Sequence, residues 1–359
     1  MSSILSQIIV FFALIAFGIL LRSLIKSDYY KKPLKLYILN IALPITIFVS
    51  IISIEIDLKY LLYPILALLF NLLLYFISPI IIRLSHITDL KKQRTLLMLL
   101  PSFAPGLSCF PIINEFLGYS ALAQASIVDV GNKIFVLIVL FFISIRLYNK
   151  TQNIANSQKK ESYGFVFKSL FYEPINIIMI VALIFLATSN TIEDIPTLIL
   201  SFFLKIKDSL APAVFIFIGV SILFTKNEFI KILPLLLIRA GFCLIVVTSI
   251  IYLFGIGFTD SSILFLILSL SSVSFWPYAH MTFIDNLEKN MQSKRKTFDL
   301  SFGLNLLAYS LPFSTIMILL LFISEKVLYN PLALYTISIV LLTLGFLLLY
   351  LNQKKLVKA

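Results

Sequence analysis

Two proline-containing stretches carry the residues of this chain whose types and spacing could bind a small charged molecule. Each proline removes a backbone amide donor and clashes with the preceding helical turn, so a helix that contains several of them is interrupted. The new N-terminus of an interrupted helix carries a partial positive charge and attracts anions. Besides Pro101, the candidate binding residues of the two stretches are Pro105, Gly106, Ser108, Pro111, Ser274 and Pro277. We therefore expect an anion site where the two stretches meet.

A second group of candidates lies in the apolar stretch that follows the first prolines. Asp129 and Lys133 are four residues apart, so on a helix they share one face and can neutralise each other. Ionisable side chains within an apolar membrane-spanning segment cost free energy unless they are paired, and they commonly mark a substrate or proton path. The pair could take part in substrate or proton coupling, or could only fix helix packing. Asn132 lies between the two, and Asn305 is its possible counterpart in the second half of the chain.

Two further polar residues, Arg239 and His280, also lie within apolar stretches. A guanidinium in such a place needs partners. For Arg239 these could be Asp129 or Asp299, a backbone carbonyl, water, or an anionic substrate. His280 could titrate near neutral pH, contact the substrate, or only pack.

The elements that must position these residues are membrane-spanning helices. Hydrophobic residues make up 60% of the chain and charged residues 13%, and the mean hydropathy is +1.03, whereas soluble proteins are about half apolar and about a quarter charged. The composition predicts an all-α integral membrane protein in contact with membrane lipid. The net charge of +12 comes from lysines and arginines clustered between apolar stretches, so it indicates topology rather than a nucleic-acid partner.

Eleven apolar stretches are long enough to cross a hydrocarbon core of about 30 Å as helices. We number them spans 1 to 11. In order, they cover residues 4–22, 34–53, 59–84, 94–118, 120–148, 173–189, 197–224, 229–257, 261–287, 298–324 and 331–352. The candidate residues fall in spans 4, 5, 8, 9 and 10.

The chain also contains an internal repeat of five spans. Pro44 and Pro212 lie in similar motifs at an offset of 168 (212 − 44), and Pro111 and Pro277 repeat at 166 (277 − 111). Basic residues follow the odd-numbered spans. In a cell membrane this pattern places the N-terminus outside the cell and the C-terminus in the cytoplasm. Because five is odd, the second repeat enters the membrane in the opposite direction. Inverted repeats with interrupted spans are typical of carriers that work by alternating access.

We expect spans 4 and 9 to cross as discontinuous helices and span 11 to be an addition to the repeats. The predicted organisation is a first repeat at 1–148, a cytoplasmic linker at 149–172, a second repeat at 173–324, and an additional helix with a basic tail at 325–359. The end of the linker, residues 163–171, could form an amphipathic helix on the inner interface or a plain connector.

The sequence shows no residue pattern that is typical of metal binding, disulfide bonding or catalysis. Cys109 and Cys243 lie in apolar stretches without neighbouring ligands, so we expect neither a metal site nor a disulfide. No phosphate-binding loop, metal cluster or Ser/His/Asp arrangement stands out. We therefore expect no cofactor and no enzymatic activity.

Several short motifs, in this order and spacing, resemble the auxin efflux carrier family of bacteria, archaea and plants. The resemblance runs through residues 1–324. It rests on residues 18–22, Leu43-Pro44, Phe110-Pro111, residues 129–132, Ala211-Pro212 and residues 218–221. It implies a scaffold of spans 1, 2, 6 and 7, through which family members form homodimers, and a mobile transport part made from the other spans.

The same resemblance implies that an organic anion, such as a dicarboxylate or indole acetate, binds beside Pro111 and Pro277. The chain departs from the family pattern at two amide positions, where it has Ala104 and a residue near Met281. His280 or Ser108 could supply a polar contact instead.

Together, the residues predict a secondary active or potential-driven carrier for a small organic anion, with substrate at the crossover of spans 4 and 9. Two alternatives remain open. One is a symporter of the same architecture that is coupled to sodium or protons. The other is a membrane sensor that binds a ligand without transporting it.

Overall fold

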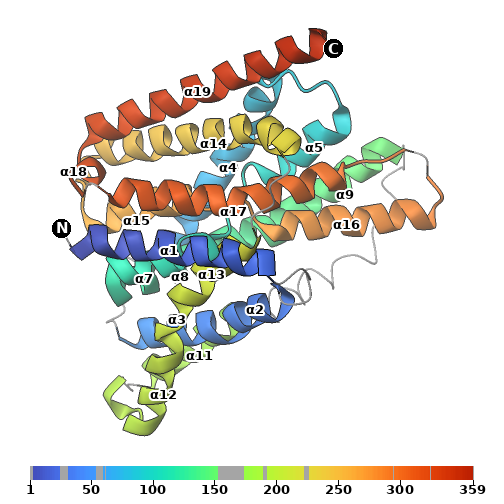
Figure 1. The fold of residues 1–359 in the computed structure, drawn as a ribbon. Coiled ribbons are helices and arrows are strands. Elements are labelled where there is room, and N and C mark those ends of the chain that lie inside the picture. The colour runs from blue at the N-terminus through green and yellow to red at the C-terminus, as the bar shows by residue number, and fades with distance from the viewer. Residues whose placement is uncertain are drawn as a thin grey trace.

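The computed structural model is built of helices, as the composition predicts (Figure 1). The residues that it describes are 3–24, 31–53, 60, 62–152, 174–188, 192–221, 226–293, 295–323 and 325–358. Among these, the structure contains no β-strand, and a single isolated bridge joins Ala104 to Ser272. The linker predicted at 149–172 lies outside the described residues from 153 onward, as does the amphipathic helix considered at 163–171.

Seven helices in the described part of the chain are long and apolar enough to cross a membrane, which supports a multi-pass membrane protein. They correspond to predicted spans 1, 2, 3, 5, 8, 10 and 11. Five are α1 (Ser3–Leu24), α4 (Leu62–Leu84), α14 (Lys226–Leu253), α17 (Leu300–Phe322) and α19 (Pro331–Lys358). The other two consist of α2 (Lys31–Tyr37), η2 (Ile38–Ala42) and α3 (Leu43–Ile52), and of α8 (Gly118–Ile134), η4 (Phe135–Val139) and α9 (Leu140–Gln152).

The remaining four predicted spans are short or interrupted helices. Span 6 is α11 (Pro174–Ala187), span 7 is α12 (Thr197–Asp208) with α13 (Leu210–Ser221), span 4 is α5 (Leu90–Leu99), α6 (Pro105–Ser108) and α7 (Phe110–Phe116), and span 9 is α15 (Asp260–Ser269) with α16 (Phe275–Asn290). Two short helices, η5 (Ile192–Asp194) and α18 (Glu325–Leu328), complete the described elements. Hydropathy alone does not distinguish these divided spans from continuous ones.

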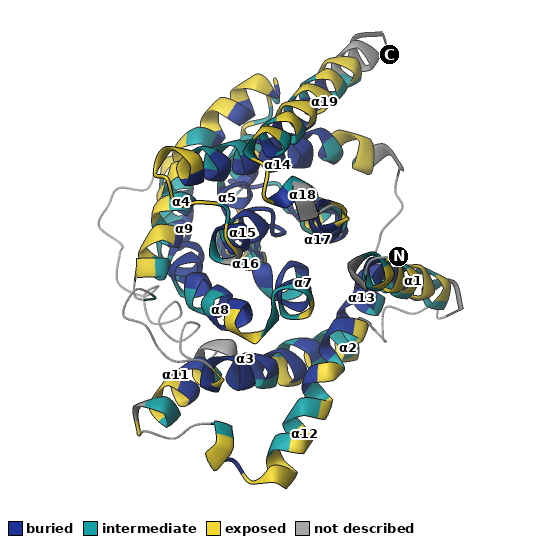
Figure 2. Ribbon diagram, turned by 90° about the vertical axis from the view of Figure 1, so that its left-hand side faces the viewer, coloured by how far each residue is buried: buried dark blue, intermediate teal, exposed yellow. Residues whose placement is uncertain are grey.

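The helices bury their inner faces and leave apolar side chains exposed outside (Figure 2). Helices α11 and α12 lie beside α3 at one end of the molecule, and α14 and α19 lie together at the other (Figure 1). Close helix packing depends on glycine, as the following two contacts show. A Cβ at Gly18 of α1 or Gly219 of α13 would overlap a carbonyl oxygen of the other helix. A Cβ at Gly131 of α8 would overlap the carbonyl oxygen of Pro64 in α4.

Candidate functional site

The interruptions of spans 4 and 9 lie against each other. Residues 100–104 separate α5 from α6, and residues 270–274 separate α15 from α16. The amide of Ala104 donates to the carbonyl oxygen of Ser272 at 2.8 Å. Two serine hydroxyls of span 4 then accept from amides of the segment 270–274, because that segment does not continue as a helix. Ser108 Oγ accepts from the amide of Ser272 at 3.1 Å, and Ser102 Oγ accepts from that of Ser274 at 3.0 Å.

Arg239 of α14 binds the carbonyl groups that the two interruptions leave unpaired. Its Nε donates to Leu100 O at 2.9 Å, its Nη1 to Ser271 O at 2.8 Å, and its Nη2 to Ser102 O at 2.9 Å. The side chain is 4% exposed, and its guanidinium lies 4.6 Å from the ring centroid of Phe103. A guanidinium has five fixed donors, and here three of them join both segments. Of the partners considered for Arg239, the structure therefore selects the backbone carbonyls.

Beside the interruptions, α8 carries a buried polar network. Lys133 Nζ lies 3.5 Å from Asp129 Oδ2, so the two form the expected pair on one helix face. Asn132 donates to Asp129 Oδ1 at 2.8 Å and to the carbonyl oxygen of Phe103 at 2.9 Å, and it accepts from Asn71 Nδ2 at 2.9 Å. Both donors of the Asn132 amide are thus used. The network ties α8 to α4 and to the interruption of span 4.

Sequence reasoning did not identify Asn71. This residue is 1% exposed and lies in α4, where Gly131 allows α8 to approach the backbone of Pro64. The signal was present in the sequence, because an asparagine interrupts an otherwise apolar run at 65–74. A lone amide at such depth needs a partner, and the partner is Asn132.

Two cavities flank the interruptions and share the lining residues Phe103, Pro105, Asp129 and Asn132. The first, which we call the polar cavity, has a volume of about 490 Å³. Its polar lining residues include Lys35, Asn40, Lys133, Ser272 and Ser274, and its aromatic lining residues include Phe217, Phe275 and Trp276. The second, the apolar cavity, has a volume of about 670 Å³. It is lined mainly by apolar residues of α4, α14 and α15, such as Phe70, Val247 and Phe265.

Lys35 is a cavity residue that sequence reasoning missed. Its Nζ lies 5.2 Å from the ring centroid of Phe275, within the range of a cation–π contact. No ion pair involves Lys35 in the part of the chain that the structure describes. In the sequence Lys35 belongs to a group of lysines after span 1, which indicates the cytoplasmic side of the membrane. Nothing in residue type or spacing separates it from Lys31 and Lys32.

The sequence candidates divide into residues that line a cavity and residues that do not. The lining candidates are Pro105, Gly106, Asp129, Asn132, Lys133 and Ser274. Ser108 lies behind the lining and bonds the two interrupted segments, as Arg239 does. Pro111 and Pro277 lie in the first turns of α7 and α16, where proline is well tolerated, and neither is among the lining residues of the two cavities.

His280 and Asn305 are not among the lining residues of either cavity. His280 is 2% exposed, its Nε2 is 2.9 Å from the carbonyl oxygen of Val136, and its ring packs edge-on against Phe141. Val136 belongs to the π-helical segment η4, whose irregular register leaves carbonyl groups for side chains. Asn305 Nδ2 donates to Glu228 Oε2 at 3.4 Å. The described contacts of His280 and Asn305 are therefore to protein groups, and their predicted contact with a substrate stays a prediction.

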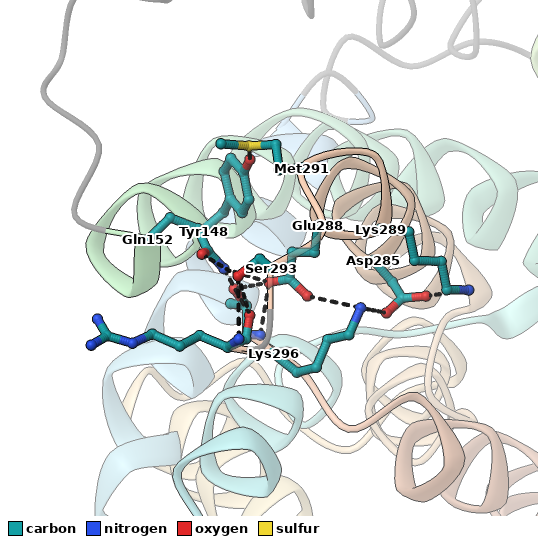
Figure 3. Close-up of polar contacts among 10 residues, drawn as sticks. Tyr148, Gln152, Asp285, Glu288, Lys289, Met291, Ser293 and Lys296 are labelled. Atoms are coloured by element: carbon teal, nitrogen blue, oxygen red, sulfur yellow. Dashed lines mark hydrogen bonds and ion pairs between the residues drawn. The ribbon is translucent and has the colours of Figure 1, made fainter.

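A further polar cluster joins the C-terminal ends of α9 and α16 to the following loop (Figure 3). The Glu288 side chain is 1% exposed. Its Oε1 accepts from the amide of Thr297 at 2.8 Å, from Thr297 Oγ1 at 2.6 Å, and from Gln152 Nε2 at 3.2 Å. Lys296 Nζ lies 2.8 Å from Asp285 Oδ1 and 3.7 Å from Glu288 Oε2. Asp285 holds the pKa of Lys296 above its usual value by accepting this hydrogen bond.

The described residues contain no group of three or more His, Cys, Asp or Glu side chains that could hold a metal ion. Cys109 and Cys243 are buried free thiols. A scan against protein-family models finds no match to this chain, and a search of curated proteins finds no similar sequence.

Proposed function

We propose that this protein is a secondary carrier that moves a small organic anion through a membrane. The observation that carries the proposal is the charge of the polar cavity. Its ionisable lining residues are Lys35, Lys133 and Asp129, which sum to +1. Because Asp129 and Lys133 neutralise each other across 3.5 Å, Lys35 is the cation left for a substrate. A monoanion balances that charge.

The N-terminus of α16 adds to the attraction for an anion. Ser274 caps this helix by accepting from the amide of Trp276 at 3.3 Å, and Ser274, Phe275 and Trp276 all line the polar cavity. A helix N-terminus contributes about half a positive charge, which favours a negative group in front of it. The aromatic side chains nearby suit an apolar substrate body. These features support an organic anion as the substrate.

The positions of the two cavities support alternating access as the mechanism. The polar cavity includes Lys35 of α2 and Ser221 at the end of α13, both of which the charge pattern assigns to the cytoplasmic side. The apolar cavity includes Tyr63 and Phe254, on the side assigned to the exterior. Phe103 and Pro105 are part of the layer between them. In the proposed cycle, this layer opens to one side at a time.

We further propose the finer architecture that the sequence suggests. Spans 1–5 and 6–10 form inverted repeats, spans 4 and 9 cross at residues 100–104 and 270–274, and the N-terminus faces the exterior of a cell membrane. Membership of the auxin efflux carrier family, with homodimers formed through spans 1, 2, 6 and 7, is part of the same proposal. The contacts between α1 and α13 at Gly18 and Gly219 support a rigid unit within that scaffold.

The test uses purified protein in proteoliposomes with a panel of labelled mono- and dicarboxylates. A negative potential of 100 mV inside favours monoanion export by about 2.3 kcal/mol, roughly a 50-fold concentration ratio. We expect voltage-dependent flux of at least one monocarboxylate. Lys35→Gln should weaken its apparent affinity at least about tenfold, since it removes a charge-assisted contact. Lys32→Gln, which removes an exposed charge from the same helix, is the matched control and should leave affinity unchanged.

The same liposomes separate the alternatives. Flux that requires a sodium or proton gradient would favour a coupled symporter. Binding without counterflow would favour a sensor. No flux and no binding across the panel would contradict all three.

A further inference from the structure

Helix α19, which has no counterpart in the proposed repeats, packs along α14 with the opposite chain direction (Figure 1). The contact is close because each helix contributes a glycine. A Cβ on Gly241 of α14 would lie 2.8 Å from Leu342 Cγ, and a Cβ on Gly345 of α19 would lie 2.6 Å from Ile238 Cγ1. Small residues at such positions let helix backbones approach each other in membranes. Backbone carbonyl oxygens of the facing helix are also near, with Ser338 O 3.0 Å from the Gly241 Cβ and Pro234 O 3.1 Å from the Gly345 Cβ, so a large side chain at either position would push the helices apart.

A specific hydrogen bond fixes one end of this contact. Pro234 lies inside α14 and has no amide, so it leaves the carbonyl of Ile230, four residues earlier, without its helical donor. Asn352 of α19 fills that gap, since its Nδ2 donates to Ile230 O at 2.8 Å. The asparagine on α19 therefore matches a defect in α14.

A second hydrogen bond fixes the other end. Tyr335 of α19 donates its hydroxyl proton to Ser249 Oγ of α14 at 3.1 Å. Asn352 and Tyr335 are 17 residues apart, which is about 26 Å along a helix, so the two bonds bracket most of a membrane thickness. With the glycines between them, they set both the register and the spacing of the two helices.

Arg239 lies on α14 two residues before Gly241, so the two residues point to nearly opposite sides of the helix. Helix α14 is thus held between α19 on one side and the interrupted segments on the other. We propose that α19 is a brace that fixes α14 in the register at which Arg239 reaches both interruptions. Asn352 and Gly345 are then positioning residues for the site. The effect on transport rests on the proposed function, whereas the effect on the interruptions does not.

The test changes α19 and measures hydrogen exchange in the interrupted segments. These segments lie on the opposite side of α14 from α19. Gly345→Leu should separate α19 from α14. We expect the amides of Ala104, Ser272 and Ser274 to exchange at least about tenfold faster, since loss of the Arg239 contacts frees the segments to open locally. Leu347→Phe adds bulk at a position of α19 that is 52% exposed. As the matched control, it should leave exchange at these amides unchanged.

A milder pair of variants keeps the proposal testable if Gly345→Leu fails to fold. Asn352→Leu removes only the donor to Ile230 O and should raise exchange at the same three amides. Its control is Thr343→Val, which removes a hydroxyl bonded within α19 itself, to Val340 O. Faster exchange confined to α14 and α19, with the interruptions unchanged, would overturn the proposal. If the wild-type protein transports no anion, the exchange result is still decisive for the brace.

Discussion

Replacing Arg239 by lysine tests how the two interruptions are held together. The substitution keeps the positive charge and most of the apolar stem but removes the planar set of donors that reaches three carbonyl groups. If the ammonium keeps one of the three bonds, two are lost. A hydrogen bond to a charged group contributes about 1.5–3 kcal/mol. The free energy of unfolding should therefore fall by about 3 kcal/mol or more.

The assay is reversible denaturant unfolding in mixed micelles, combined with hydrogen exchange at residues 100–104 and 270–274. Arg83→Lys is the control, since Arg83 is an exposed residue of α4 and the same chemical change there should have little effect. Exchange should rise in both interrupted segments together, because one side chain binds both. If Arg239→Lys stays within about 0.5 kcal/mol of the wild type, as ordinary surface substitutions do, the reasoning is refuted. Faster exchange in only one segment would also refute it.

Three further predictions concern other contacts. Gly131→Ala should lower the free energy of unfolding by at least about 1 kcal/mol through overpacking, since the new methyl group overlaps the carbonyl of Pro64; unchanged unfolding in the same micelles would contradict this. Glu288→Leu should cost about 1–3 kcal/mol because Thr297 loses the acceptor of its buried donors, whereas Glu193→Leu, an exposed control, should cost far less. Lys296 has a raised pKa, so its stabilisation is present below about 10.5, the ordinary lysine value, and is lost as pH rises through the raised value. The melting temperatures of wild type and Lys296→Met should converge over that range, and a constant difference would contradict the prediction.

The sequence predicted the features that depend on local chemistry. Apolar length located the seven long helices that could cross a membrane, because a membrane-spanning segment must satisfy its backbone polar groups internally. Proline chemistry located the interruption of span 4, and helical spacing paired Asp129 with Lys133. Each of these inferences needs only residues that are neighbours in the chain or on one helix face.

Features that depend on distant segments were not predictable in the same way. The partners of Arg239 are carbonyl groups, which every residue has, and only the folded interruptions leave these particular ones unpaired. Lys35 belongs to a run of lysines that indicates topology, and only the folded chain brings it to the cavity and to Phe275 of α16. The bond from Asn352 to Ile230 joins positions 122 residues apart in the chain. The position of Pro234 in the sequence shows that the Ile230 carbonyl lacks its helical donor, but not that Asn352 supplies another.

A structure with a bound monocarboxylate, selected by flux from the panel, tests the central claim most directly. We predict density for the carboxylate in the polar cavity, within hydrogen-bond distance of Lys35 Nζ and in front of the N-terminus of α16. Density for the anion only in the apolar cavity, or a polar cavity left empty at saturating ligand, would contradict it.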